Sequence, residues 1–220
     1  MEPFMAETDR KLGPEHFERV DESDDAKFYT QERLVRHIDD EACNALAVWY
    51  MNNLPEGGDV LDLMSSWVSH LPPDSRYGRV AGLGMNRIEL EANNRLTEHV
   101  VHDLTGNPSL PYDDASFDAC LIAVSVQYLT RPLEVFAEIA RVLRPGGICA
   151  VSFSNRMFPT KAIALWRGMD DMGHAKIVGY YFVEAGGFEQ PEFSDISPHP
   201  GATDPLYLVT ARKKPAVGSV

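Results

Sequence analysis

The chain has 220 residues, of which 44% are hydrophobic and 10% aromatic, a composition typical of a folded globular domain. Its formal net charge of -13 argues against a nucleic-acid partner, because binding along a phosphate backbone needs clustered Lys and Arg. The three cysteines form no CxxC pair, the start lacks signal-peptide character, and no apolar run approaches the ~20 residues of a membrane span, so we expect a cytoplasmic protein that neither crosses nor binds a membrane.

The N-terminal part divides into an arm and a helical cover. Residues 1–27 are rich in charge and predict a mobile arm. Residues 28–212 are expected to form one domain, in which Thr30 to Ile38 looks helical. A second helix follows Asp39, a plausible N-cap, and the two helices within residues 28–54 are expected to cover a site. Residues 213–220 are expected to be a frayed tail.

The middle of the chain alternates between strand and helix patterns. Short buried strands are predicted at residues 59–63, 79–83, 99–104 and 117–124. Asn86, with Glu89 three residues later, is a capping-box variant that opens a helix to about Leu96.

The block from Ser116 to Phe153 says most about the architecture. An apolar strand is followed by an amphipathic helix over residues 132–143, a stop at Arg144-Pro145-Gly146-Gly147, and a second apolar strand over residues 148–153. Two strands joined through a helix lie parallel in one buried sheet, and such sheets bind ligands at the carboxyl ends of their strands.

The remaining residues complete the expected fold. Lys161 to Met169 and Ala175 to Ala185 look helical, and residues 188–196 and 206–211 look like an antiparallel pair of strands. The fold class is therefore predicted as α/β, a doubly wound, seven-stranded, mostly parallel sheet whose last strand is antiparallel.

A series of motifs resembles a known family. The motifs are a strand ending in Asp62, then Asp103-Leu104, Leu110-Pro111-Tyr112, Ser116-Phe117-Asp118 and Arg141 to Gly147. In this order and spacing they resemble the class I S-adenosylmethionine-dependent methyltransferases, in particular the type 11 methyltransferase domains with their Rossmann-like fold. The resemblance is detailed over residues 60–153, and Gly186-Gly187-Phe188 also looks like that family's terminal hairpin.

The resemblance implies a cofactor site for S-adenosyl-L-methionine. By that likeness Asp62 would lie near the methionyl ammonium, Asp103 would accept from the adenine amino group, and Leu104 would pack on the ring. Each of these residues is equally typical of a strand-end turn or a helix cap. Asp118 is expected to be structural.

Two departures leave the function of that site open. The family follows its first strand with a glycine-rich loop, whereas Met64, Ser66 and Val68 stand in the corresponding places here. Gly84 stands where the family has an acid that grips the ribose hydroxyls. In one interpretation Ser65 and Ser66 supply hydroxyls, Gly84 admits the backbone, Met85 stacks on the adenine and Asn86 bonds the ribose. In the other, the pocket holds something else or nothing.

Acceptor-side residues are predicted around the same strand ends. His70 is a candidate general base, with a capping or exposed role as the alternative. Gln127 and Tyr128 follow the fourth strand, where related enzymes place acceptor-contacting groups, and Ser125 is a candidate cofactor contact. Tyr29, Trp67 and Arg156 are candidate substrate contacts, and Arg156 would suit an anionic acceptor or simply be solvated.

The leading hypothesis is a methyltransferase that acts on a small molecule, as a monomer or homodimer. The alternatives are a non-catalytic methyltransferase-like domain with a binding or regulatory role, and a nicotinamide-dependent oxidoreductase, which the absence of a G-x-G-x-x-G motif disfavours. No metal is predicted, because His99 and His102 would point to opposite faces of their strand.

Overall fold

Seven strands form one sheet in the order β3-β2-β1-β4-β5-β7-β6, in a computed structural model that describes residues 12–216. The strands are β1 (Asp59–Leu63), β2 (Arg79–Gly84), β3 (Glu98–Val101), β4 (Phe117–Ala123), β5 (Leu143–Phe153), β6 (Glu192–Asp195) and β7 (Tyr207–Arg212). The pairs among β3, β2, β1, β4 and β5 are parallel, whereas β7 runs antiparallel to both β5 and β6. The predicted fold class is confirmed.

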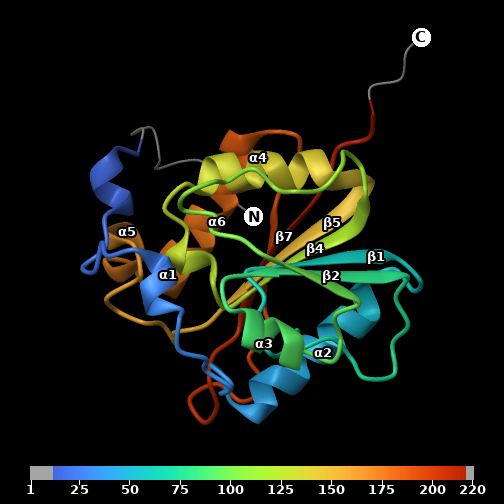
Figure 1. The fold of residues 1–220 in the computed structure, drawn as a ribbon, viewed down its shortest axis with the longest axis horizontal. Coiled ribbons are helices and arrows are strands. Elements are labelled where there is room, and N and C mark those ends of the chain that lie inside the picture. The colour runs from blue at the N-terminus through green and yellow to red at the C-terminus, as the bar shows by residue number, and fades with distance from the viewer. Residues whose placement is uncertain (1–11, 217–220) are drawn as a thin grey trace.

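Helices cover both faces of this sheet (Figure 1). They are η1 (Pro14–Phe17), α1 (Asp25–Phe28), α2 (Asp40–Asn53), α3 (Arg87–Ala92), η2 (Val126–Tyr128), α4 (Pro132–Val142), α5 (Ala164–Arg167) and α6 (Asp171–Ala185). Figure 1 shows α4 above the sheet and α2 and α3 below it. Among residues 12–216 no helix is long and apolar enough to cross a membrane.

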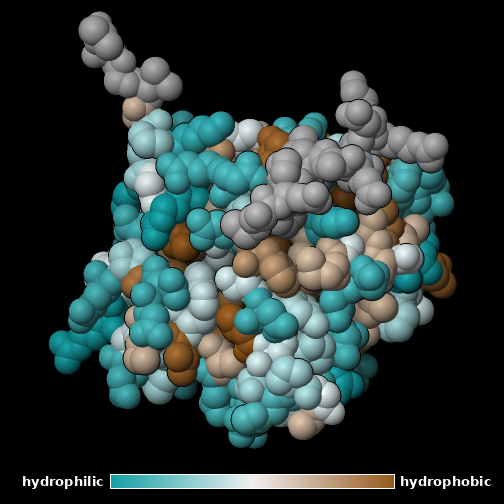
Figure 2. Space-filling view, turned by 180° about the vertical axis from the view of Figure 1, so that it is seen from behind, coloured by the Kyte–Doolittle hydropathy of each residue, from teal (hydrophilic) through white to brown (hydrophobic). Residues whose placement is uncertain are grey.

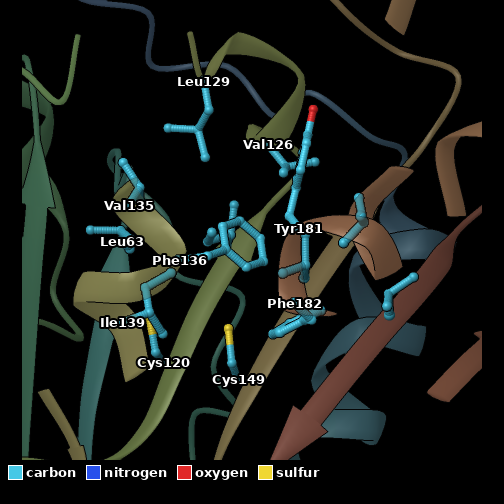
Figure 3. Close-up of a cluster of buried hydrophobic side chains, with 14 of the residues drawn as sticks. Leu63, Cys120, Val126, Leu129, Val135, Phe136, Ile139, Cys149, Tyr181 and Phe182 are labelled. Atoms are coloured by element: carbon cyan, nitrogen blue, oxygen red, sulfur yellow. The ribbon is translucent and has the colours of Figure 1, made fainter. Parts of the chain in front are cut away.

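Two apolar layers hold the helices to the sheet. Phe136 of α4 and Tyr181 and Phe182 of α6 pack over Cys120 of β4 and Cys149 of β5 (Figure 3). On the opposite face Leu46 and Tyr50 of α2 pack in a second buried cluster that includes strand residues from β1, β4 and β5. Because the central strands are buried on both faces, they read in the sequence as continuous apolar runs. The face seen in Figure 2 is mostly hydrophilic outside the residues drawn in grey, with hydrophobic residues in separate spots.

The Arg144-Pro145-Gly146-Gly147 motif has a structural role at the start of the strands. Arg144 pairs with Asp59 at 2.8 Å and also with Asp118, and the Asp118 carboxylate accepts from the Asp59 N–H at 2.8 Å. Gly146 has φ 80°, a backbone conformation that favours glycine. The predicted structural role of Asp118 is confirmed, since this residue joins β1, β4 and β5.

The N-terminal segment differs from its prediction. Thr30 to Ile38 is not helical, because its backbone groups bond to other parts of the molecule. The Arg33 N–H donates to Glu89 at 2.7 Å, and the Trp67 indole donates to the Val35 carbonyl at 3.0 Å. Asp39 does cap α2, accepting from the Ala42 N–H at 2.8 Å, so the expected N-cap is confirmed.

Part of the predicted mobile arm is packed against the domain. Within residues 12–27, Arg19 and Asp25 are buried and form an ion pair of 2.7 Å. Residues 1–11 of the arm and 217–220 of the expected tail lie outside the described residues. The described start of the tail is also held, because the Lys213 N–H donates to the Gly147 carbonyl at 2.8 Å.

Two predicted helices are shorter than expected. The one predicted up to Leu96 ends at Ala92, because Asn93 takes the C-cap position and turns its amide to the Ser66 carbonyl and the Ser69 hydroxyl, both at 2.8 Å. The one predicted over Lys161 to Met169 is reduced to α5, whose first residue, Ala164, donates its N–H to the Glu18 carbonyl at 2.7 Å.

Candidate active site

A partly open cleft with a volume of about 130 Å³ lies at the carboxyl ends of β1, β2 and β4. This is the edge at which open parallel sheets bind ligands. Its wall is contributed by the N-terminal segment between Asp25 and His37, the loop from Asp62 to His70, and residues at the ends of β2, β3, β4 and β5. Segments far apart in the sequence therefore converge on one site.

Strained backbone gathers around this cleft. Of the four non-glycine residues with positive φ among the described ones, three line it: Met64 (φ 59°), His70 (φ 54°) and Val124 (φ 51°). For a β-branched residue such as Val124 this conformation is a genuine outlier. Each such residue costs of the order of 1 kcal/mol or more and persists where the surroundings enforce it, which is typical of ligand sites.

Asp62 is the buried carboxylate of the site. It lies one residue before the end of β1 with 2% of its surface exposed, and one of its oxygens accepts from the hydroxyls of Ser65 and Ser69, each at 2.6 Å. Burial raises its pKa from 3.8 to about 6, although the two hydroxyls oppose that shift by stabilising the charged form. The Asp62 carboxylate is thus positioned for a cationic partner. The positive charge of such a partner would lower the pKa of Asp62 again and keep the carboxylate ionised.

The glycine-free loop after β1 is held against β2. The Ser65 N–H donates to the Leu83 carbonyl at 2.8 Å, and Met64, Ser65, Ser66 and Val68 all line the cleft. A Cβ on Gly84 would lie 2.1 Å from the Ser65 carbonyl oxygen. Gly84 is therefore required by the close approach of these two backbone segments, which is a packing reason that the sequence does not reveal.

Glu89 is a site residue that the sequence analysis missed. This α3 residue is 7% exposed and lines the cleft, where its carboxylate accepts from the Ser66 hydroxyl and from the Arg33 N–H, both at 2.7 Å. The sequence marks Glu89 only through its spacing from Asn86, and this spacing predicts the N-terminal cap of a helix and no site residue. Asn86 does cap α3, at 3.1 Å from the Glu89 N–H, but its amide donates to the Tyr29 carbonyl at 2.8 Å and its side chain does not line the cleft.

Asp103 and Leu104 lie at the β3 side of the cleft, together with Met85 from the end of β2. The two Asp103 oxygens accept from the N–H groups of Thr105 at 2.8 Å and Gly106 at 3.2 Å. Each oxygen keeps a lone pair for a further donor. Leu104 is buried beside it and offers an apolar surface.

The β4 side brings together Ser125 and Tyr128 but not Gln127. The Ser125 hydroxyl is buried in the cleft wall without a hydrogen-bond partner, which marks it as a group available to a ligand. The Tyr128 oxygen accepts from the Phe158 N–H at 2.8 Å, and the two rings stack. Gln127 faces away from the cleft and donates to the carbonyls of Val124 at 3.0 Å and Arg156 at 3.3 Å, so it braces the wall.

The remaining predicted residues divide between two hollows. His70, Tyr29 and Trp67 line the main cleft, whereas Arg156 lies in an adjoining hollow, ion-paired with Asp204 at 2.7 Å. Burial, reinforced by Arg36 and His37, lowers the pKa of His70 to about 4. Its imidazole is therefore neutral at pH 7. Among the described residues no group of three His, Cys, Asp or Glu could hold a metal ion.

Comparison with known proteins identifies the family. The profile of the methyltransferase domain family matches residues 67–151, which include the Ser116–Asp118 and Arg141–Gly147 motifs and the β4-side wall of the cleft. This match and the shared fold support the class I S-adenosylmethionine-dependent methyltransferases as the family. The S-adenosylmethionine-dependent methyltransferase of Mesorhizobium loti shares the fold, with a TM-score of 0.52 and 15% identity over 77% of this chain and 98% of that one.

Two curated relatives of this methyltransferase-family chain align over parts of their length. The biotin biosynthesis bifunctional protein BioHC of Teredinibacter turnerae is 34% identical over 79 residues, which are 36% of this chain and 14% of the relative. The methyltransferase GfsG of Streptomyces halstedii is 30% identical over 142 residues, 59% of this chain and 51% of the relative. The chain thus spans about half or less of the curated relatives that it matches.

Proposed function

We propose that this protein transfers a methyl group from S-adenosyl-L-methionine to a small-molecule acceptor. The observation that carries the proposal is the convergence of Asp62, Asp103 and Ser125 on one cleft at the carboxyl edge of the sheet, in a chain of this family. Small-molecule chemistry is also consistent with relatives named as a biotin biosynthesis protein and a methyltransferase.

The residues of the cleft fit this cofactor. Asp62 would face the ammonium group, Asp103 and Leu104 the adenine, and the partnerless Ser125 hydroxyl a further polar group. Gly84 stands where an acid was expected, but Glu89 places a carboxylate in the same wall from the first turn of α3. We assign to Glu89 the hydrogen bonds to the ribose hydroxyls, in exchange for those it accepts from Ser66 and Arg33.

The chain's own groups would orient the acceptor and exclude water. When bound, the cofactor supplies an electrophilic methyl group on a sulfonium, and in-line displacement then needs alignment and, for a weak nucleophile, a base. His70 is uncharged at neutral pH and can accept a hydrogen bond from the acceptor, but its pKa of about 4 makes it a weak base. Tyr29 and Trp67 line the cleft on the side of the N-terminal segment. The Tyr128 phenol oxygen is held in place by the hydrogen bond that it accepts from the Phe158 N–H.

A non-catalytic binding domain is the second candidate, favoured by the side chains of Met64, Ser66 and Val68 in the cofactor-side wall. Titration calorimetry with S-adenosylmethionine, S-adenosylhomocysteine and NAD separates the candidates. We expect both sulfur nucleosides to bind and NAD not to bind. Asp103→Ala should weaken their binding by about 1–3 kcal/mol, the cost of a lost charge-assisted hydrogen bond. No binding of either sulfur nucleoside at millimolar concentration would refute methyl transfer.

A further inference from the structure

A second hollow opens beside the main cleft, and we call it the annex. It has a volume of about 420 Å³. Both hollows are lined by Arg36, His37, Val124, Tyr128 and Phe158, so they adjoin along these residues. Arg156 and Asp204 lie in the annex only. A molecule that lies across both hollows would therefore meet charged side chains in the annex and an aromatic and aliphatic wall toward the main cleft.

The carboxylates of the annex are occupied by the fold itself. Asp39 accepts from the Ala42 N–H at 2.8 Å and from the Asp204 N–H at 2.7 Å, and Asp204 accepts in return from the Asp39 N–H at 3.0 Å. This reciprocal pairing ties the start of α2 to the segment before β7. The negative charge of both side chains is thus directed toward backbone donors and away from a ligand.

The arginines are held more loosely. Arg156 directs Nε and Nη2 to a single Asp204 oxygen, at 2.8 and 2.7 Å, and its side chain is 61% exposed. Among residues 12–216, Arg36 pairs only with Asp40, whose side chain is 78% exposed. The Arg36–Asp40 pair is open to water on both sides and contributes about 0–1 kcal/mol, so an anion in the annex can replace it at little cost. The Asp204 side chain is only 9% exposed, so an anion would share Arg156 with Asp204 and not displace it. Asp204 serves meanwhile to orient Arg156.

We propose that the annex binds an anionic group, a carboxylate or a phosphate, carried by the methyl acceptor. This rests on the proposed methyl transfer. Arg36 and Arg156 bind the anion through their planar forks, and the apolar part of the acceptor lies along Val124, Tyr128 and Phe158 toward Ser125. Two arginines at the mouth of a site on a protein of net charge -13 select anions that the rest of the surface repels.

The test uses benzoate, phenyl phosphate and benzyl alcohol as probes, which share one ring and differ in charge. Each is titrated into the protein, alone and saturated with S-adenosylhomocysteine, with affinity read from ligand-observed NMR. We expect at least one anion to bind tenfold or more tightly than the neutral alcohol, and the preferred anion distinguishes a carboxylic acid from a phosphate ester. Equal binding of all three probes would overturn the annex assignment.

Variants locate the binding. The Arg36→Gln and Arg156→Gln double variant should lose tenfold or more in anion affinity. Arg156→Gln alone, at a residue that lies in the annex only, should lose part of that affinity with unchanged affinity for S-adenosylhomocysteine. Arg156→Lys, which keeps the charge but not the fork, guards against a folding defect and should lose part of that affinity. Arg131→Gln, outside both hollows, is the matched control and should lose none. Unchanged anion affinity in the double variant refutes the annex, whereas failure of S-adenosylhomocysteine to bind the wild-type protein refutes methyl transfer instead.

Discussion

The Lys161 ammonium lies 3.0 Å from an Asp25 oxygen, and the two side chains are only 1% and 6% exposed. Arg19 donates to both oxygens of the same carboxylate, at 2.9 and 2.7 Å. Burial opposes ionisation of Asp25, but the hydrogen bonds from Arg19 and Lys161 outweigh it and lower the pKa. Because Asp25 also lines the cleft, this buried cluster fixes the N-terminal segment at the edge of the site.

Lys161→Met tests how much this cluster contributes to stability. The change removes one charge from a buried group and leaves Arg19 as the cation paired with Asp25, which also accepts from the Thr105 hydroxyl at 3.1 Å. Breaking a buried pair typically costs 3–5 kcal/mol, and since one cation remains we expect a loss of about 2–4 kcal/mol in the free energy of unfolding, measured by urea denaturation. Lys27→Met, at an exposed position on α1, is the matched control and should change stability by less than about 0.5 kcal/mol. Equal effects of the two changes would show that the buried cluster adds no stability.

The sequence predicts the central strands and α4 well, for a physical reason. A strand buried on both faces is a continuous apolar run between turns, so β1 was predicted at its observed bounds and β4 within one residue. The proline in the first turn and the apolar stripe of α4 are equally local signals. Such elements are encoded within a short window of sequence.

The parts that failed depend on contacts between distant residues. Thr30 to Ile38 has helical character, but the side chains of Glu89, Asn86 and Trp67 bond to its backbone groups and keep it out of a helix. Glu89 was predicted only as part of a helix cap, because its spacing along the helix does not show which distant residues its carboxylate contacts in the folded protein. Gly84 was expected to make room for a ligand, whereas it makes room for the Ser65 carbonyl.

Gly84→Ala should disrupt the wall of the cleft. The added Cβ would lie 2.1 Å from the Ser65 carbonyl oxygen, so the loop after β1 has to move away from β2. We expect a loss of about 1–3 kcal/mol in stability, as for other overpacked sites, together with weaker binding of S-adenosylhomocysteine. Gly168→Ala is the control, because the nearest atoms to its added Cβ are at 3.7 Å. Thermal unfolding and calorimetry measure both effects. Wild-type stability in Gly84→Ala would contradict the close approach of the two segments.

Asp62 should make stability depend on pH. Its pKa is about 6 in the folded protein and 3.8 in the reference state, so the folded state binds the proton more tightly. Stability from this group is fully present below pH 3.8 and is lost as the pH rises through 6, by about 2–3 kcal/mol for a shift of about 2 pH units. Asp62→Asn removes the ionisation, so its stability relative to wild type should rise by this amount between pH 4 and 8. A stability difference that stays constant with pH would exclude an uncompensated buried charge at Asp62.

Glu89→Gln tests the assignment of the ribose contact to α3. The glutamine keeps one oxygen that can accept from the Arg33 N–H, and its NH2 group can donate to the Ser66 hydroxyl oxygen, so the fold should persist, but it lacks the charge that strengthens bonds to ligand hydroxyls. We expect S-adenosylhomocysteine to bind roughly 10- to 100-fold more weakly, since a hydrogen bond to a charged group contributes about 1.5–3 kcal/mol. Glu91→Gln, on the exposed side of the same helix, should bind as the wild-type protein does. If Glu89→Gln kept both its melting temperature and its affinity, Glu89 would serve only to hold the N-terminal segment to the loop after β1.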